Sequence, residues 1–159
     1  MRPTNVTRLL DSREIKYTAF ELPPEKLGAL ETARLLDVPI ETVYKSIVLT
    51  RKGRGKTILA VIPGNLEVNL KAAAQVLGEK KVSLATERDA ERLTGLQAGG
   101  ISPLALINRG FQVVIHKSAR TQDKIHISGG IRGLNIQLSP LALARLTKAS
   151  FADICTTFA

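Results

Sequence analysis

Apolar residues recur at the spacing of an amphipathic helix in several parts of the chain, and capping residues precede most of these stretches. Thr4 is expected to cap a first helix whose apolar stripe contains Val6, Leu9 and Leu10. Further helices are predicted over residues 30–36, 70–77, 86–94 and 141–146. The expected caps of the last three are Asn69, Thr86 and Ser139. Gly78 and Gly95 are the matching C-terminal stops.

Runs of β-branched and other apolar residues predict the strands. They cover residues 15–22, 46–50, 57–62, 81–85, 111–116, 124–128 and 134–138, and residues 151–154 form a last packing segment. The runs at 46–50 and 57–62 are expected to pair as a β-hairpin with a basic tip. Because helices and strands do not alternate regularly, a doubly wound fold is excluded. We predict a single α+β domain, residues 1–159, with a mixed, antiparallel-rich sheet.

Length and composition agree with one globular domain. The chain has 159 residues, of which 44% are hydrophobic and only 4% aromatic, so the core must be aliphatic. No apolar run approaches the ~20 residues of a membrane span, and the first residues lack the apolar region of a signal peptide. We therefore expect a cytoplasmic protein.

The cysteine and the histidines give no sign of a metal site. The single cysteine, Cys155, makes no internal disulfide and no cysteine-based zinc site. His116 and His126 lie in strand-like runs without metal-ligand spacing. No metal or cofactor is expected.

The charge is more informative than the composition. The formal net charge is +9, with a pI of about 10.1. Residues 42–81 hold eight Lys and Arg against two Glu, and the hairpin tip is the densest part, with Arg51, Lys52, Arg54 and Lys56. This balance favours a polyanionic partner such as nucleic acid, although a solvated basic surface remains the alternative. The tip is not a phosphate-binding P-loop, because Thr50 stands where the pattern needs glycine.

Three segments carry the candidate chemistry, and we predict that they converge on one pocket. Lys45 lies in the apolar frame 43–48 and is suited to present its charge to a phosphate or carbonyl oxygen, or else extends to solvent. The glycine turns at 98–103 and 128–133 offer backbone amides to an anion, or simply reverse the chain. Ser102 and Ser128 are possible hydrogen-bond donors, but no Ser/His/Asp arrangement is legible.

These segments resemble a known family. Val43-Tyr44-Lys45-Ser46, Gly99-Gly100-Ile101-Ser102-Pro103, Ser128-Gly129-Gly130-Ile131-Arg132-Gly133-Leu134 and Phe151-Ala152-Asp153-Ile154 are similar, in order and separation, to the YbaK/EbsC branch of the prolyl-tRNA-synthetase-associated editing domains. The likeness covers nearly the whole chain. It implies a mixed, barrel-like sheet surrounded by helices, and removal in trans of cysteine from mischarged tRNA(Pro), beside prolyl-tRNA synthetase; no DNA partner is implied.

The resemblance also assigns roles to residues. Lys45, Gly99 and Ser128 fall on the catalytic positions, with the lysine at the 3′-terminal nucleotide. The expected substrate-binding residues are Phe20, Gly100, Ile101, Ser102, Gly129, Gly130 and Arg132. The charge, rather than the resemblance, makes the hairpin tip residues Arg51, Lys52, Arg54 and Lys56 the candidates for contacts with tRNA phosphates.

The implied chemistry needs no protein nucleophile. The thiol of the substrate cysteine attacks its own activated ester, and the pocket supplies orientation and carbonyl polarisation. Two alternatives stay open at this point. One is a hydrolytic deacylase for Ala-tRNA(Pro) or another small aminoacyl-tRNA, and the other is a non-catalytic tRNA-binding module.

Overall fold

The computed structural model describes residues 1–156, so the last three residues of the expected domain lie outside it. Within that range the α-helices are α1 (Asn5–Ser12), α2 (Ala29–Leu36), α3 (Leu70–Val76), α4 (Glu87–Thr94) and α5 (Pro140–Thr147). Short 3₁₀ segments are η1 (Ile40–Thr42), η2 (Pro103–Leu106) and η3 (Lys117–Thr121). Side chains of Thr4, Asn69, Thr86 and Ser139 cap four of the α-helices as predicted.

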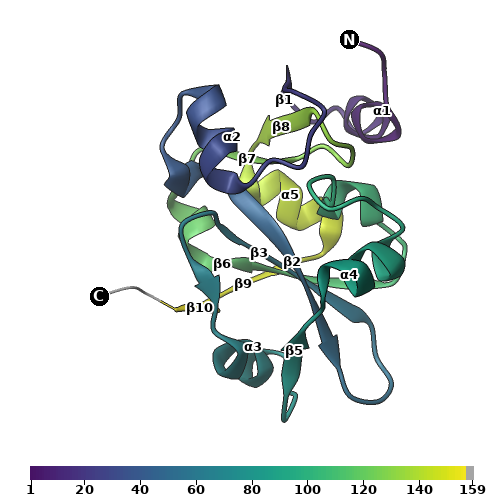
Figure 1. The fold of residues 1–159 in the computed structure, drawn as a ribbon, viewed down its shortest axis with the longest axis vertical. Coiled ribbons are helices and arrows are strands. Elements are labelled where there is room, and N and C mark those ends of the chain that lie inside the picture. Colours follow the sequence, from purple (N-terminus) through teal and green to yellow (C-terminus); the bar gives the residue numbers. More distant parts are fainter. Residues whose placement is uncertain (157–159) are drawn as a thin grey trace.

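The strands form three sheets, and most of the helices lie on the outside of them (Figure 1). The largest has the order β5 (Val82–Leu84), β2 (Tyr44–Arg51), β3 (Thr57–Pro63), β6 (Phe111–His116) and β9 (Ser150–Ala152). A three-stranded sheet has the order β1 (Tyr17–Glu21), β8 (Leu134–Leu138) and β7 (Ile125–Ser128). The short strands β4 (Glu67–Val68) and β10 (Cys155–Thr156) pair with each other. The α+β class is confirmed.

The predicted hairpin is the centre of the large sheet. β2 pairs antiparallel with β3, whereas β3 pairs parallel with β6 and β6 pairs parallel with β9. Ile58, Leu59 and Ile62 of β3 are fully buried because both faces of this strand are covered. This double burial explains why the sequence of β3 is a continuous apolar run rather than an alternating one.

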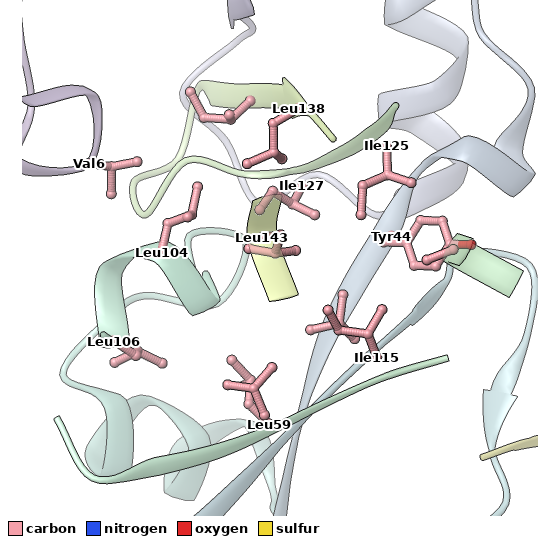
Figure 2. Close-up of a cluster of buried hydrophobic side chains, with 14 of the residues drawn as sticks. Val6, Tyr44, Leu59, Leu104, Leu106, Ile115, Ile125, Ile127, Leu138 and Leu143 are labelled. Carbon is pink, nitrogen blue, oxygen red and sulfur yellow. The ribbon is translucent and has the colours of Figure 1, made fainter. Parts of the chain in front are cut away.

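The main core lies between the large sheet and the three-stranded sheet, with α5 inserted (Figure 2). Leu59 and Ile115 come from the large sheet, Ile127 and Leu138 from the smaller one, and Leu143 from α5. A second core lies on the other face of the large sheet, under α3 and the C-terminal segment. Both are aliphatic, as the composition predicts, apart from Tyr44 in the main core.

The described strands do not close into a barrel. A parallel bridge between Val43 and His126 joins the start of β2 to β7. β2 gains its next neighbour on that side only where the Ala85 amide, just after the end of β5, donates to the Val48 carbonyl. Between these two points, the edge of β2 that faces away from β3 has no paired strand in the described part of the chain. This open seam is where the candidate site lies.

Candidate active site

A cavity of about 360 Å³ occupies the seam between β2 and the three-stranded sheet. This volume falls within the range of small-molecule sites. Residues 43–48 of β2 form one wall, and Ala98, Gly99, Ile101 and Ser128 form the facing wall. The lining also includes residues on and before α2: Leu22, Glu25, Leu27, Gly28, Ala29 and Thr32. The three segments that carried the candidate chemistry are therefore brought together.

Lys45 stands at this cavity near the start of β2. Its Nζ lies 3.3 Å from the carbonyl oxygen of Gly64 and 3.4 Å from Oε1 of Glu67. The lysine side chain is 26% exposed, but that of Glu67 is 67% exposed, so solvent screens the ion pair. The ammonium is thus held between a backbone carbonyl and a solvent-exposed carboxylate.

The two glycine loops pack backbone against backbone. Gly99 has φ +88°, and a Cβ there would lie 3.1 Å from Cα of Lys26, so both conformation and space require glycine. A Cβ on Gly100 would lie 3.1 Å from Cα of Ile131 in the second loop. Nε of Arg132 donates a hydrogen bond to the Ala98 carbonyl at 2.7 Å. These contacts hold the first loop at the cavity wall.

Ser128 and the covering segment complete this side of the cavity. Oγ of Ser128 donates to the carbonyl of Gly99 at 3.4 Å and accepts from the amide of Gly130 at 3.3 Å. Lys26 forms an ion pair with Glu87, which ties residues 22–28 to the N-terminus of α4. Glu87 also lines the cavity. The glycine loop is therefore covered by residues 22–28, and this covering segment is linked to α4 by the Lys26–Glu87 ion pair.

Other predicted substrate-binding residues lie outside the cavity lining. Ser102 is fully buried, and its Oγ accepts a hydrogen bond from the Leu104 amide, which caps η2. Gly129 packs on Leu134, and Gly130 faces Ala105 and Val6 on the opposite side of the loop. The residues concerned are Phe20, Gly100, Ser102, Gly129, Gly130 and Arg132, none of which is in the lining within residues 1–156. The loop residues among them support the two loops, whereas Phe20 of β1 packs against the ring of His126.

The hairpin tip lies at the far end of β2 from Lys45, roughly 20 Å along the strand. Lys52, Arg54 and Lys56 are exposed there. Arg51 instead makes an ion pair with Glu79 at 2.8 Å and donates to Oε1 of Gln112, and its side chain is only 11% exposed. The Arg51 guanidinium thus holds the tip to its neighbours.

Sequence reasoning missed Asn135, which lines the cavity and is only 4% exposed. It is the cross-strand partner of Ser128 in the β7–β8 pair. Oδ1 of Asn135 lies 2.9 Å from Nδ1 of His126, a histidine whose pKa is lowered by burial. The signal that identifies Asn135 is the register of the two strands, and that register is not legible in the sequence.

A serine, a histidine and an aspartate also meet, at the end of β6 and outside the cavity lining. Nδ1 of His116 accepts the backbone N–H of Ser118 at 3.3 Å and lies 2.8 Å from Oγ of that serine. Nε2 of the histidine lies 3.6 Å from Oδ1 of Asp153, and Tyr44 bonds the serine hydroxyl at 2.7 Å. Burial lowers the pKa of His116. This network caps η3 and ties the C-terminal segment to it.

Cys155 is a poor candidate nucleophile. Burial raises the pKa of its thiol to about 12, so the thiol stays protonated near neutral pH. It pairs with Val68 of β4 and packs in the second core. The described residues contain no group of three or more His, Cys, Asp or Glu suited to hold a metal ion, and no helix among them is long and apolar enough to cross a membrane.

Comparisons with known proteins place this architecture. Among solved structures, the hypothetical protein APE2540 superposes with a TM-score of 0.86 and 25% identity over 95% of this chain and 99% of that one. A structure described as a trans-editing enzyme for prolyl tRNA synthetase superposes with a TM-score of 0.80 at 22% identity, over 98% of this chain and 100% of that one.

Sequence relatives agree with the structural matches. EbsC of Enterococcus faecalis, named as a Cys-tRNA(Pro)/Cys-tRNA(Cys) deacylase, is 33% identical over 96% of this chain and 93% of its own length. The proline–tRNA ligase of Trichlorobacter lovleyi is 29% identical over 79% of this chain, which corresponds to 23% of that enzyme. The family model described as the aminoacyl-tRNA editing domain matches residues 24–146. The chain therefore belongs to the aminoacyl-tRNA editing domain family.

Proposed function

We propose that this protein is an aminoacyl-tRNA deacylase that removes cysteine from Cys-tRNA(Pro) in trans. The observation that carries the proposal is the cavity at the open seam. It is lined both by a positioned cation, Lys45, and by a glycine loop in which Gly99 has no room for a side chain. Family membership and the name of the Enterococcus relative support the same reaction. Because the substrate is a charged tRNA, the protein acts in the cytoplasm, beside prolyl-tRNA synthetase.

The site is suited to orient an ester that is already activated. The Lys45 ammonium contacts the phosphate or ribose of the terminal nucleotide, and the loop around Gly99 encloses the aminoacyl group. Oγ of Ser128 is hydrogen-bonded to the Gly99 carbonyl, and the described contacts of this serine include no histidine that would activate it. Orientation and electrostatic polarisation of the carbonyl are therefore the contributions of the protein.

The substrate supplies the nucleophile in this reaction. The thiol sulfur of the esterified cysteine forms a bond to its own ester carbonyl carbon, and the bond from that carbon to the ribose oxygen breaks. The thiol proton is transferred to the ribose oxygen, so the products are deacylated tRNA with a free terminal ribose hydroxyl and a cyclic thiolactone. Serine would react more slowly by this route, because its hydroxyl is a weaker nucleophile, and alanine has no group to attack with.

A single-turnover deacylation panel tests the proposal. The substrates are tRNA(Pro) charged with cysteine, S-methylcysteine, serine or alanine, each with saturating enzyme. Fast release from the free-thiol substrate alone, with a trapped thiolactone, supports the proposal, and Cys155→Ser should match the wild type. Equal rates for cysteine and S-methylcysteine would instead show a hydrolase that uses water. Tight tRNA binding without release of any amino acid would identify a tRNA-binding module.

A further inference from the structure

The three-stranded sheet has a buried polar face. Its other face packs in the main core through Ile127, Ile136 and Leu138. The polar face carries His126, which is 2% exposed, and Asn135, which is 4% exposed. Side chains alternate across a strand, so these residues share the face that turns away from the core. Buried polar side chains of this kind are normally held in a defined hydrogen-bond arrangement.

The hydrogen bonds on this face run in one direction. Oδ1 of Asn135 carries no proton, so Nδ1–H of His126 donates to it across 2.9 Å. A neutral imidazole then has an acceptor at Nε2, and the Gln137 amide nitrogen lies 3.4 Å away as its donor. Burial lowers the pKa of His126, which keeps the ring neutral at neutral pH. The ring is also packed against Phe20, with centroids 5.5 Å apart.

The chain of donors ends at the cavity. Because Oδ1 of Asn135 is committed to His126, the amide nitrogen of Asn135 points its protons the other way. Within residues 1–156 this nitrogen makes no hydrogen bond and is not enclosed, and Asn135 lines the cavity beside Ser128. The cavity therefore contains a neutral hydrogen-bond donor, the Asn135 amide, and the hydrogen bond from His126 to its oxygen fixes the direction of that amide.

We propose that the Asn135 side-chain amide donates a hydrogen bond to the aminoacyl ester oxygen in this cavity, and that His126 is the positioning residue that fixes its direction. This proposal rests on the proposed deacylase function. A carbonyl oxygen gains negative charge as the ester is attacked, so a prepositioned donor acts most strongly in the transition state. Without His126 the amide is free to turn its oxygen toward the substrate, which would repel that charge.

Two pairs of variants test the proposal. Asn135→Asp keeps the shape and the acceptor for His126 but replaces the donor with an oxygen. We expect its single-turnover rate constant at saturating enzyme to fall about 100-fold, the size of the loss when one oxyanion donor is removed. The half-saturating enzyme concentration should change less than about threefold, because the contact is made in the transition state. Asn135→Gln serves as the amide-retaining comparison and should lose less.

The second pair concerns the positioning role. Asn at position 126 keeps an N–H donor near the place of Nδ1, whereas Leu removes it. His126→Asn should therefore retain most of the activity, and His126→Leu should lose about tenfold, although both lose the ring contact with Phe20. Thermal unfolding of each variant establishes that it is folded, and if His126→Leu does not fold, the Asn135 pair carries the test.

The outcomes separate this proposal from the proposed function. A wild-type protein that releases no amino acid from any aminoacyl-tRNA of the panel would overturn the deacylase function itself. An active wild type with Asn135→Asp equally active would overturn only the role of Asn135. A loss that lies entirely in the half-saturating concentration would also overturn it, since the contact would then serve binding rather than the reaction.

Discussion

At the scale of single residues, the structure distinguishes side chains that face the cavity from those that build its walls. Lys45 is held at the cavity by the Gly64 carbonyl, and its other partner, Glu67, is exposed to solvent. Ser102 lies in the same glycine segment as Gly99, but its side chain caps η2 by accepting a hydrogen bond from the Leu104 amide. Sequence proximity to a functional residue therefore says little about whether a side chain reaches the substrate.

Lys45→Ala is expected to reduce deacylation by roughly 10- to 150-fold, because a charged hydrogen bond contributes about 1.5–3 kcal/mol. Stability should change little, since an exposed ion pair contributes about 0–1 kcal/mol. Single-turnover deacylation together with thermal unfolding measures both. Lys71→Ala is the matched control, because this lysine is exposed on α3 and lies outside the cavity lining. Full activity in a folded Lys45→Ala protein would remove the lysine from the site.

At the scale of elements, the cavity depends on how the glycine loop and the β2–β3 hairpin are held. The segment 22–28 lies against Gly99, and Arg132 reaches across to the carbonyl of Ala98. The hairpin extends from the cavity at one end to the basic tip at the other. Under the proposed function, this one element links the cavity for the aminoacyl end of a tRNA to a basic surface suited to its phosphates.

Gly99→Ala should destabilise the protein and damage its activity. At φ +88° an L-residue is strained by about 1 kcal/mol, and the added Cβ meets the backbone of Lys26 at 3.1 Å. Gly78 is the control, because it also has a positive φ, +70°, but a Cβ there meets nothing within 4 Å and the residue lies outside the cavity lining. Urea unfolding and deacylation of both variants make the comparison. If Gly99→Ala behaved like Gly78→Ala, close packing of the loop would not matter.

The hairpin tip should contribute to the salt dependence of tRNA binding. Each phosphate contact contributes a log–log slope of about −0.7 to −0.9, through counterion release. Neutralising Lys52, Arg54 and Lys56 together should make the slope less steep, as measured by binding at several salt concentrations. Arg51→Ala should chiefly lower stability, because its guanidinium is paired with Glu79 inside the protein. An unchanged slope in the triple variant would mean that the tip only faces solvent.

At the scale of the whole molecule, two buried neutral histidines make stability depend on pH. Burial lowers the pKa values of His116 and His126 below the ordinary value of 6.5. Below pH 6.5 the unfolded chain therefore takes up protons that the folded protein does not. The free energy of unfolding is fully retained above pH 6.5 and falls as the pH drops from there toward the folded pKa values.

This dependence can be measured by urea unfolding between pH 7.5 and 5.5. The wild type should lose stability across this interval, and His126→Asn should lose less, because one of the two titrating groups is gone. The mild range limits the contribution of carboxylates, whose ordinary pKa values are lower. A wild-type stability that stayed constant down to pH 5.5 would show that neither histidine is held neutral by the fold.

The sequence by itself determined the local structure. Caps at Thr4, Asn69, Thr86 and Ser139 and the basic hairpin were predictable because their hydrogen bonds join residues close along the chain. The approach of the two glycine loops and Lys45 to one pocket was also anticipated. The resemblance to editing domains placed the chain in the right family before any fold was known.

Only the tertiary structure decided where the seam opens and what lines it. The parallel pairing of β3 with β6, the short β4–β10 pair and the single Val43–His126 bridge join residues far apart in the chain. Whether such strands pair, and in which register, depends on how the side chains pack in the shared cores. The same packing buries Arg51 among its partners and turns Asn135 toward the cavity. No local sequence pattern predicts the burial of Arg51 or the orientation of Asn135, because their partners, Glu79 and His126, lie on segments that only the fold brings close to them.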